Sequence, residues 1–195
     1  GGTTTVVDYC TPPPGASLMS GLEDWHRRRA NACVDVGAHM IVLDAGAATL
    51  AEMKTLVERE GISSFKFFMA YPGALMLEDG ALFTALRAAG ALGALSCVHA
   101  ENGPVIQSLV QAALAQGQTA LRHHALTRPA LLEGEATQRA IDLAELAQAP
   151  LYVVHRPPRR PCRQCSGRGS VACRCMPRPA RSTCCWMTRS ARRRL

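Results

Sequence analysis

Three polar residues sit in apolar, strand-like runs where chemistry could be built. Lys66 lies inside one run, and His99 and His155 each end another. The carboxyl ends of parallel strands share one edge of a sheet, where functional sites form, and histidines on neighbouring strands can share a zinc ion. A buried ammonium is costly, so Lys66 must be paired or chemically altered. Taken singly, such a histidine is more often structural and such a lysine more often solvated or salt-bridged.

Short runs rich in β-branched residues alternate with amphipathic segments along the chain. The predicted strands are residues 4–9, 34–43, 64–69, 94–99 and 151–155. The predicted helices are residues 18–31, 48–60, 79–89, 104–116 and 133–147. This α/β alternation predicts a parallel sheet covered by helices.

Two architectures fit such a sheet, a (β/α)8 barrel of the TIM type and a doubly wound sheet. The first predicted strand is followed by Pro12, Pro13 and Pro14 instead of a glycine-rich phosphate loop. This favours the barrel over a dinucleotide-binding fold. Five strands supply only part of an eight-stranded barrel.

Composition changes abruptly after His155. Residues 156–195 hold 12 of the 22 basic residues, 6 of the 9 cysteines and no acidic residue, so residues 1–155 have a net charge of −5. The overall charge of +7 therefore belongs to the tail. No apolar run of 18 residues and no signal-peptide pattern occurs, so we expect a cytoplasmic protein without membrane contacts. We expect Cys10, Cys33 and Cys97 to be buried thiols.

Three segments occur in a fixed order, residues 63–71 (SSFKFFMAY), 98–103 (VHAENG) and 150–155 (PLYVVH). They place His99 33 residues after Lys66 and His155 56 residues after His99. In sequence and spacing they resemble signature segments of the dihydropyrimidinase and D-hydantoinase family of amidohydrolases. The resemblance extends over residues 1–155 and includes residues 2–4 (GTT) and 133–137 (EGEAT).

The resemblance implies a metal-dependent amidohydrolase barrel with a two-metal centre. Two divalent ions, expected to be zinc, would be bridged by a carboxylated Lys66, and His99 and His155 would bind one of them. The Tyr71 hydroxyl would hydrogen-bond the substrate carbonyl and its developing oxyanion. The metals would lower the pKa of a bridging water and polarise the amide carbonyl.

The implied reaction belongs to pyrimidine catabolism. A dihydropyrimidine or hydantoin ring would open to an N-carbamoyl amino acid. The implied partner is a small cyclic ureide or imide, with no nucleic acid, and a complete relative is expected to be a homotetramer.

Part of the family's ligand set has no counterpart in this sequence. The family carries a His-x-His pair on its first barrel strand and an aspartate on its eighth, and neither is present. The four remaining histidines are expected to be helix-surface or packing residues: His26, His39, His123 and His124. We therefore expect the chain itself to be incomplete and inactive or nearly so.

Other functions within the superfamily remain open. One is a non-catalytic dihydropyrimidinase-related protein of the collapsin-response mediator group, whose members lack the metal-binding lysine and the last histidine that this chain retains. Another is an allantoinase-like or dihydroorotase-like hydrolase, although residues 65–71 are more similar to the hydantoinase branch.

The tail admits two interpretations. Its closely spaced cysteines, Cys162, Cys165, Cys173 and Cys175, resemble a chaperone-type zinc module, whose arginines could contact nucleic-acid phosphates. The favoured interpretation is a shifted reading frame. Read from the third base of each codon, residues 184–188 must encode Leu-Leu-Asp-Asp, and residues 177–183 can encode Glu-Thr-Cys-Pro-Gln-Tyr-Leu. That string resembles the next family segment, so residues 1–155 are predicted to be a partial catalytic barrel and residues 156–195 a frameshifted, disordered tail.

Overall fold

The computed structural model describes residues 2–156, 171–175 and 183–189, with side chains described for residues 2–154. Five parallel strands lie side by side in chain order. They are β1 (Thr5–Cys10), β2 (Asp35–Ile41), β3 (Ser64–Phe68), β4 (Leu95–His99) and β5 (Leu151–Arg156). Two antiparallel strands, β6 (Val171–Cys175) and β7 (Thr183–Arg189), complete the sheet order β1-β2-β3-β4-β5-β7-β6.

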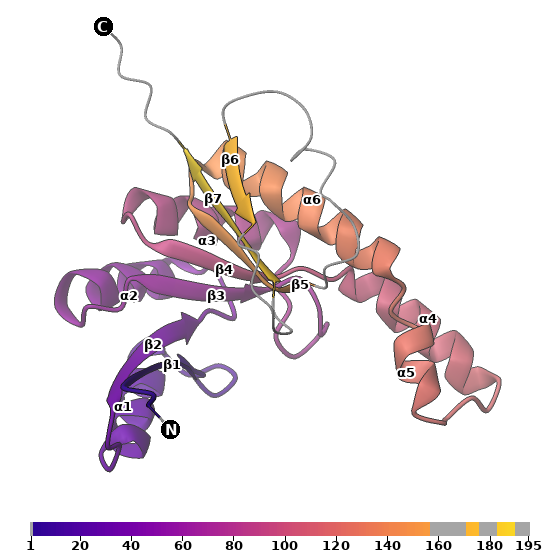
Figure 1. The fold of residues 1–195 in the computed structure, drawn as a ribbon, viewed down its shortest axis with the longest axis horizontal. Helices are drawn as coiled ribbons and strands as arrows, with labels where there is room; N and C mark the ends of the chain where they lie inside the picture. The colour runs from indigo at the N-terminus through magenta and orange to yellow at the C-terminus, as the bar shows by residue number, and fades with distance from the viewer. Residues whose placement is uncertain (1, 157–170, 176–182, 190–195) are drawn as a thin grey trace, which may run out of the picture.

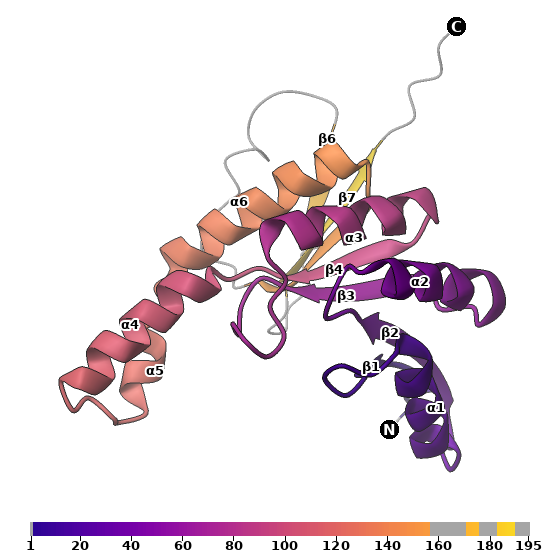
Figure 2. The same ribbon diagram turned by 180° about the vertical axis from the view of Figure 1, so that it is seen from behind.

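Helices connect the parallel strands. They are α1 (Leu18–Arg29), α2 (Ala47–Arg59), α3 (Asp79–Ala91), α4 (Gly103–Ala115), α5 (Arg122–Leu126) and α6 (Ala130–Ala147). In Figures 1 and 2, α1, α2, α3 and α6 cover one face of the sheet, and α4 and α5 extend from the body as an arm. Within the described part of the chain, no helix is long and apolar enough to cross a membrane.

The strand order bears on the choice between the two predicted architectures. A doubly wound sheet reverses its strand order at a switch point, whereas β1 to β5 follow one another without reversal. The α/β class with a parallel sheet is therefore confirmed, and its sequential order is consistent with part of a barrel.

The core lies between the sheet and its helices. Alternate strand residues such as Phe65, Phe67 and Val98 pack there against helix residues such as Leu56 and Leu86, all five fully buried. The intervening strand residues, Lys66 among them, project from the opposite face. The helical covering of one face thus leaves polar strand residues on the other.

Side-chain caps mark the starts of two helices, α1 and α4. The Ser17 hydroxyl accepts a hydrogen bond from Ser20 N at the start of α1, and the Asn102 side chain accepts one from Val105 N at the start of α4. Side-chain oxygens at these positions satisfy backbone N–H groups that lack intrahelical partners. The second cap lies three residues after His99.

The region predicted to be a tail contributes β6 and β7 to the sheet. Its other residues, 157–170, 176–182 and 190–195, lie outside the described part, as do the side chains of all its cysteines. The zinc-module and frameshift hypotheses, and the boundary at residue 155, therefore remain predictions, which the coding DNA would test.

Candidate active site

The strand register places Lys66 and His99 on one face of the sheet. Lys66 pairs with Cys97 on β4, and Phe68, two residues further along β3, pairs with His99. Paired residues of parallel strands project to the same side, and residues two apart return to it. Lys66, Phe68 and His99 therefore share the face that the helices leave uncovered.

Lys66 is a buried amine with weak partners. Its side chain is 1% exposed, and its Nζ lies 3.8 Å from the centre of the Phe68 ring and donates to the Phe67 carbonyl oxygen at 3.3 Å. No carboxylate among the residues with described side chains pairs with it. Burial lowers the pKa of Lys66 to about 7, and the Cys97 thiol opposes part of this shift. The sequence prediction of a buried lysine in need of a partner or a modification is consistent with this geometry.

His99 is held by a carboxylate and two aromatic rings. Its Nε2 lies 3.0 Å from Glu101 Oε2. Its ring stacks on Tyr71, with centroids 5.5 Å apart and planes 22° from parallel, and lies 5.7 Å from the Phe68 ring. The Phe68 ring thus lies next to both the His99 ring and the Lys66 amine.

Tyr71 occupies a strained position in the loop after β3. Its φ of 67° lies in the left-handed region, which non-glycine residues rarely adopt. Its carbonyl oxygen accepts hydrogen bonds from the backbone N–H groups of Ala74, Leu75 and Met76 at 3.0–3.3 Å. This turn holds the Tyr71 ring, 42% exposed, against His99.

Backbone contacts tie this loop to the segment after β4. Met69 N donates to the His99 carbonyl oxygen at 3.0 Å, and Gly103 N donates to the Met69 carbonyl oxygen at 3.2 Å. A Cβ at Gly103 would lie 2.9 Å from both Ala70 Cα and Met76 Sδ. Only glycine therefore allows α4 to begin so close to the Tyr71 loop.

A polar layer beside Lys66 was not predicted from the sequence. His39 Nδ1 lies 2.6 Å from Ser64 Oγ, and its ring lies 5.4 Å from that of Tyr9. Burial and then the charge of Lys66 lower the pKa of His39. His39 was predicted to be a surface or packing histidine, and it is a packing residue on the same face as Lys66. Strand periodicity could have placed it there, since Ile41, two residues later, pairs with Lys66.

The other histidines singled out in the sequence lie on α1, α5 and β5. His26 lies on α1, and His123 and His124 lie on α5, consistent with helix-surface histidines. His155 lies in β5, the strand next to β4, but its side chain is outside the described ones. The structure therefore brings Lys66, His99 and Tyr71 together and does not test His155.

The three cysteines before residue 155 differ in burial. Cys10 and Cys97 are buried thiols as predicted, but Cys33 is exposed, because it lies in the turn before β2 instead of in a strand. Among the residues whose side chains are described, no three His, Cys, Asp or Glu groups cluster as a metal site. The proposed ligand Lys66 is not one of these four residue types, and the side chain of His155 is outside the described ones. This observation therefore does not test the proposed set of metal ligands.

Comparison with known proteins identifies the relatives of this chain. No family model matches it. The D-hydantoinase of Streptomyces coelicolor is 53% identical to it over 156 residues, which are 80% of this chain and 33% of that protein. The chain is a partial member of the D-hydantoinase and dihydropyrimidinase family. It spans about a third of the length of the curated relatives it matches.

Other relatives of this family member have the same two names. The D-hydantoinase of Geobacillus stearothermophilus is 48% identical over 156 residues, and the dihydropyrimidinase of Arabidopsis thaliana is 43% identical over 155. Each match covers 80% of this chain, and the chain covers 33% of the Geobacillus protein and 29% of the Arabidopsis protein. The crystal structure of dihydropyrimidinase from Brevibacillus agri superposes with a TM-score of 0.77 at 51% identity, covering 80% of this chain and 34% of that one.

Proposed function

We propose that this family member carries part of the active site of a metal-dependent hydrolase that opens dihydropyrimidine or hydantoin rings to N-carbamoyl amino acids. The supporting observation is the buried Lys66 amine, which lacks a carboxylate partner in the described region and lies on the strand beside His99. The relatives' names, hydantoinase and dihydropyrimidinase, indicate the class of ring.

The chemistry of Lys66 fits a carboxylated lysine. With a pKa of about 7, a large fraction of the amine is neutral at neutral pH. The Nζ lone pair of a neutral amine can form a bond to the carbon of CO2, and loss of one N–H proton leaves an anionic carbamate. This replaces a buried cation that has no counter-ion among the described side chains with an anion whose oxygens suit divalent metals.

The residues present can hold part of a two-metal centre. Lys66, His99 and His155 are the proposed ligands, and two divalent ions, expected to be zinc, are the proposed cofactors. When bound, the metals would supply an activated water and polarise the ring carbonyl. Glu101 would orient the His99 imidazole, as carboxylates beside metal-binding histidines do.

Tyr71 is the proposed substrate-contacting residue. Its partial exposure and its stacking on His99 support a role in which its hydroxyl would donate a hydrogen bond to a ring carbonyl of the substrate. The same bond would strengthen as negative charge develops on that oxygen.

The chain alone is expected to turn over little or no substrate, because it lacks a His-x-His pair and an aspartate like those of the family. We propose that the complete protein is a cytoplasmic homotetramer acting on a small cyclic ureide or imide. The non-catalytic and allantoinase-like or dihydroorotase-like alternatives are outcomes of the experiment below.

The experiment is a chimera in which this chain's matched stretch replaces its counterpart in the Streptomyces coelicolor D-hydantoinase. We expect zinc-dependent hydrolysis of hydantoin or dihydrouracil that is lost when Lys66, His99 or His155 is replaced by alanine. Lys54→Ala is the control, because Lys54 is the only other lysine and its side chain is 64% exposed. A folded chimera that binds no zinc would favour the non-catalytic alternative, and turnover of only allantoin or dihydroorotate would favour the neighbouring chemistry.

A further inference from the structure

Asn102 joins the segment after His99 to two helices. It is the N-cap residue of α4 and lies three residues after His99. Its Oδ1 accepts a hydrogen bond from Val105 N at 3.2 Å, and its Nδ2 donates one to Glu135 Oε2 on α6 at 2.7 Å. One side chain therefore holds the first turn of α4 and ties it to α6.

Arg139 extends this contact to α3. Its Nε donates to Glu135 Oε1 at 2.9 Å, and its Nη1 donates to Asp79 Oδ1. Asp79 is the first residue of α3, and Figures 1 and 2 show α6 lying along α3. The guanidinium group thus links the start of α3 to the carboxylate that holds Asn102. These four side chains form a clamp, defined by Asp79, Asn102, Glu135 and Arg139.

The clamp lies at the ends of the two segments that carry Tyr71 and His99. The loop that contains Tyr71 leads into α3, whose first residue is Asp79. The segment that begins at His99 leads into α4, whose N-cap residue is Asn102. Between these ends the two rings stack with centroids 5.5 Å apart. The clamp therefore ties together the far ends of the two segments whose side chains meet.

The clamp contributes more to geometry than to stability. The side chains of Arg139, Asp79 and Glu135 are 29%, 52% and 44% exposed, and ion pairs exposed to water contribute little to the free energy of unfolding. The guanidinium group nevertheless donates to carboxylates on two helices, in directions that its planar shape sets. Its loss should therefore change the relative position of the two segments more than the stability of the chain.

We propose that Arg139 is a positioning residue for the Tyr71–His99 pair. Through Glu135 it fixes Asn102, and through Asp79 it fixes the start of α3. The Tyr71 hydroxyl and the His99 imidazole are thereby kept in one relative position. The catalytic roles of these two groups rest on the proposed function, whereas the clamp itself requires no turnover.

The first test measures hydrogen exchange in the 195-residue chain. Two backbone N–H groups hold the segments together, because Met69 N donates to the His99 carbonyl oxygen at 3.0 Å and Gly103 N to the Met69 carbonyl oxygen at 3.2 Å. In Arg139→Met, these two N–H groups should exchange about fivefold faster, which corresponds to the loss of about one hydrogen bond.

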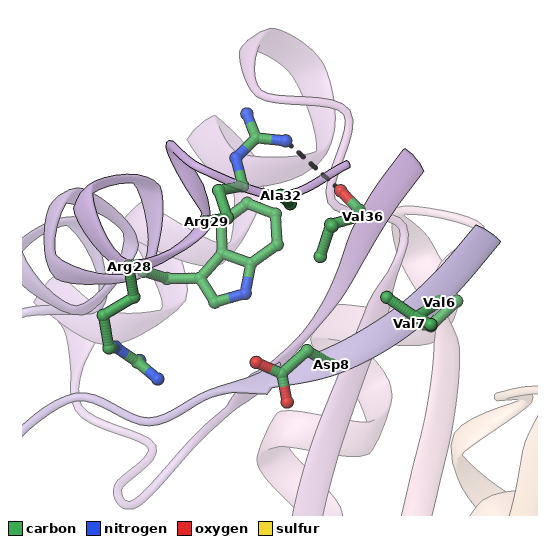
Figure 3. Close-up of a pocket in the computed structure, with 8 residues that line it drawn as sticks. Val6, Val7, Asp8, Arg28, Arg29, Ala32 and Val36 are labelled. Atoms are coloured by element: carbon green, nitrogen blue, oxygen red, sulfur yellow. Dashed lines mark hydrogen bonds between the residues drawn. The ribbon is translucent and has the colours of Figure 1, made fainter. Parts of the chain in front are cut away.

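Arg29→Met is the matched control. Figure 3 shows Arg29 of α1 donating to the Val36 carbonyl oxygen on β2, at 3.2 Å, so this arginine also joins a helix to another element. Val36 lies near the amino end of β2, whereas the Tyr71–His99 pair lies at the carboxyl ends of β3 and β4. Arg29→Met should therefore leave the exchange of the two N–H groups unchanged.

A swap of donor and acceptor tests the route through Glu135. Asn102→Asp keeps an oxygen to cap α4 but removes the donor to Glu135, so exchange should accelerate as in Arg139→Met. Adding Glu135→Gln supplies a donor from the other side, because the new amide can donate to the new carboxylate while its oxygen accepts from Arg139. The double variant should return to within about twofold of the original exchange rate.

The second test uses the chimera with the Streptomyces coelicolor D-hydantoinase. Arg139→Met should lower kcat about tenfold and change KM by less than about twofold, because a misplaced Tyr71 weakens a contact that strengthens in the transition state. Arg29→Met should change neither value. This separation of kcat from KM is not expected of an arginine that only stabilises the fold.

Circular dichroism establishes that each variant is folded, and Asn102→Asp with its double variant replaces Arg139→Met if the latter unfolds. Unchanged exchange in Arg139→Met, equal effects of the two arginine variants, or no recovery in the double variant would overturn the proposal. So would an unchanged kcat for Arg139→Met in an active chimera. Faster exchange in Arg139→Met, together with a chimera that has no turnover, would instead refute the proposed catalysis and still support the clamp.

Discussion

The rings of Tyr71 and His99 stack 5.5 Å apart, with their planes inclined by 22°. This contact joins the loop after β3 to the end of β4, and therefore links the strand that carries Lys66 to its neighbour. Tyr71 reaches His99 from a left-handed backbone conformation with φ 67°. Such a conformation costs on the order of 1–3 kcal/mol and persists where surrounding contacts fix it, often at functional sites.

Tyr71→Phe should separate the stacking role of this side chain from its hydroxyl. In the chimera, the ring still packs on His99 but no oxygen donates to the substrate carbonyl, so kcat/KM should fall by about 100-fold, as when one oxyanion donor is lost. Zinc content, measured by atomic emission, should stay unchanged. Undiminished hydrolysis by Tyr71→Phe would remove Tyr71 from the proposed site.

Gly103→Ala should destabilise the chain through the Tyr71 loop. Its new Cβ would lie 2.9 Å from Ala70 Cα, a backbone atom that cannot easily move. The free energy of unfolding, measured in urea, should therefore fall by about 1–3 kcal/mol. Gly134→Ala on α6 is the control, because a Cβ there meets nothing within 4 Å. That substitution should stabilise the chain by about 0.5–1 kcal/mol through helix propensity. Equal effects of the two would contradict the close approach.

Ser64→Ala should remove the hydrogen bond between Ser64 Oγ and His39 Nδ1, which are 2.6 Å apart. The half-buried imidazole would lose its partner, at a cost of about 1–3 kcal/mol in the free energy of unfolding. The exposed neighbour Ser63→Ala is the control and should change stability by less than about 0.5 kcal/mol. If both serines behaved alike, the polar layer beside Lys66 would have no energetic role.

Cys10 should give the chain an alkaline limit to its stability. Burial raises the pKa of this thiol from 9.0 to about 11, with smaller contributions from nearby charges. The unfolded thiol ionises first, so the folded state loses relative stability as the pH rises from about 9 to 11, by about 2 kcal/mol in total. Stability should be measured by urea unfolding at several pH values. Cys10→Ala should flatten this slope, and Cys33→Ala, at an exposed thiol, should leave it unchanged.

Local patterns were sufficient to predict most of the elements. A short apolar run predicted β3 at residues 64–69, and it spans Ser64–Phe68. Helix α1 was predicted at residues 18–31 and ends at Arg29. Helix α5 (Arg122–Leu126) was missed because five residues form barely more than one turn and cannot establish a helical period.

Contacts between strands were harder to predict than the strands. Sequence periodicity indicates which face a residue occupies, but the register between β2 and β3 depends on packing across the sheet. The bond between His39 and Ser64 and the charge of Lys66 near His39 follow from that register. Lys66 and His99 could be predicted because they end or interrupt apolar runs, whereas Glu101 and Ser64 carry no such signal on their own.

The most direct test of the account is detection of a carbamate on Lys66. The chimera is incubated with zinc and 13C-labelled bicarbonate, and the carbamate carbon is observed by 13C NMR. We predict one carbamate signal per chain that disappears in Lys66→Ala and persists in Lys54→Ala. A folded, zinc-loaded chimera without this signal, or a signal that survives in Lys66→Ala, would contradict the assignment of Lys66 as the metal-bridging residue.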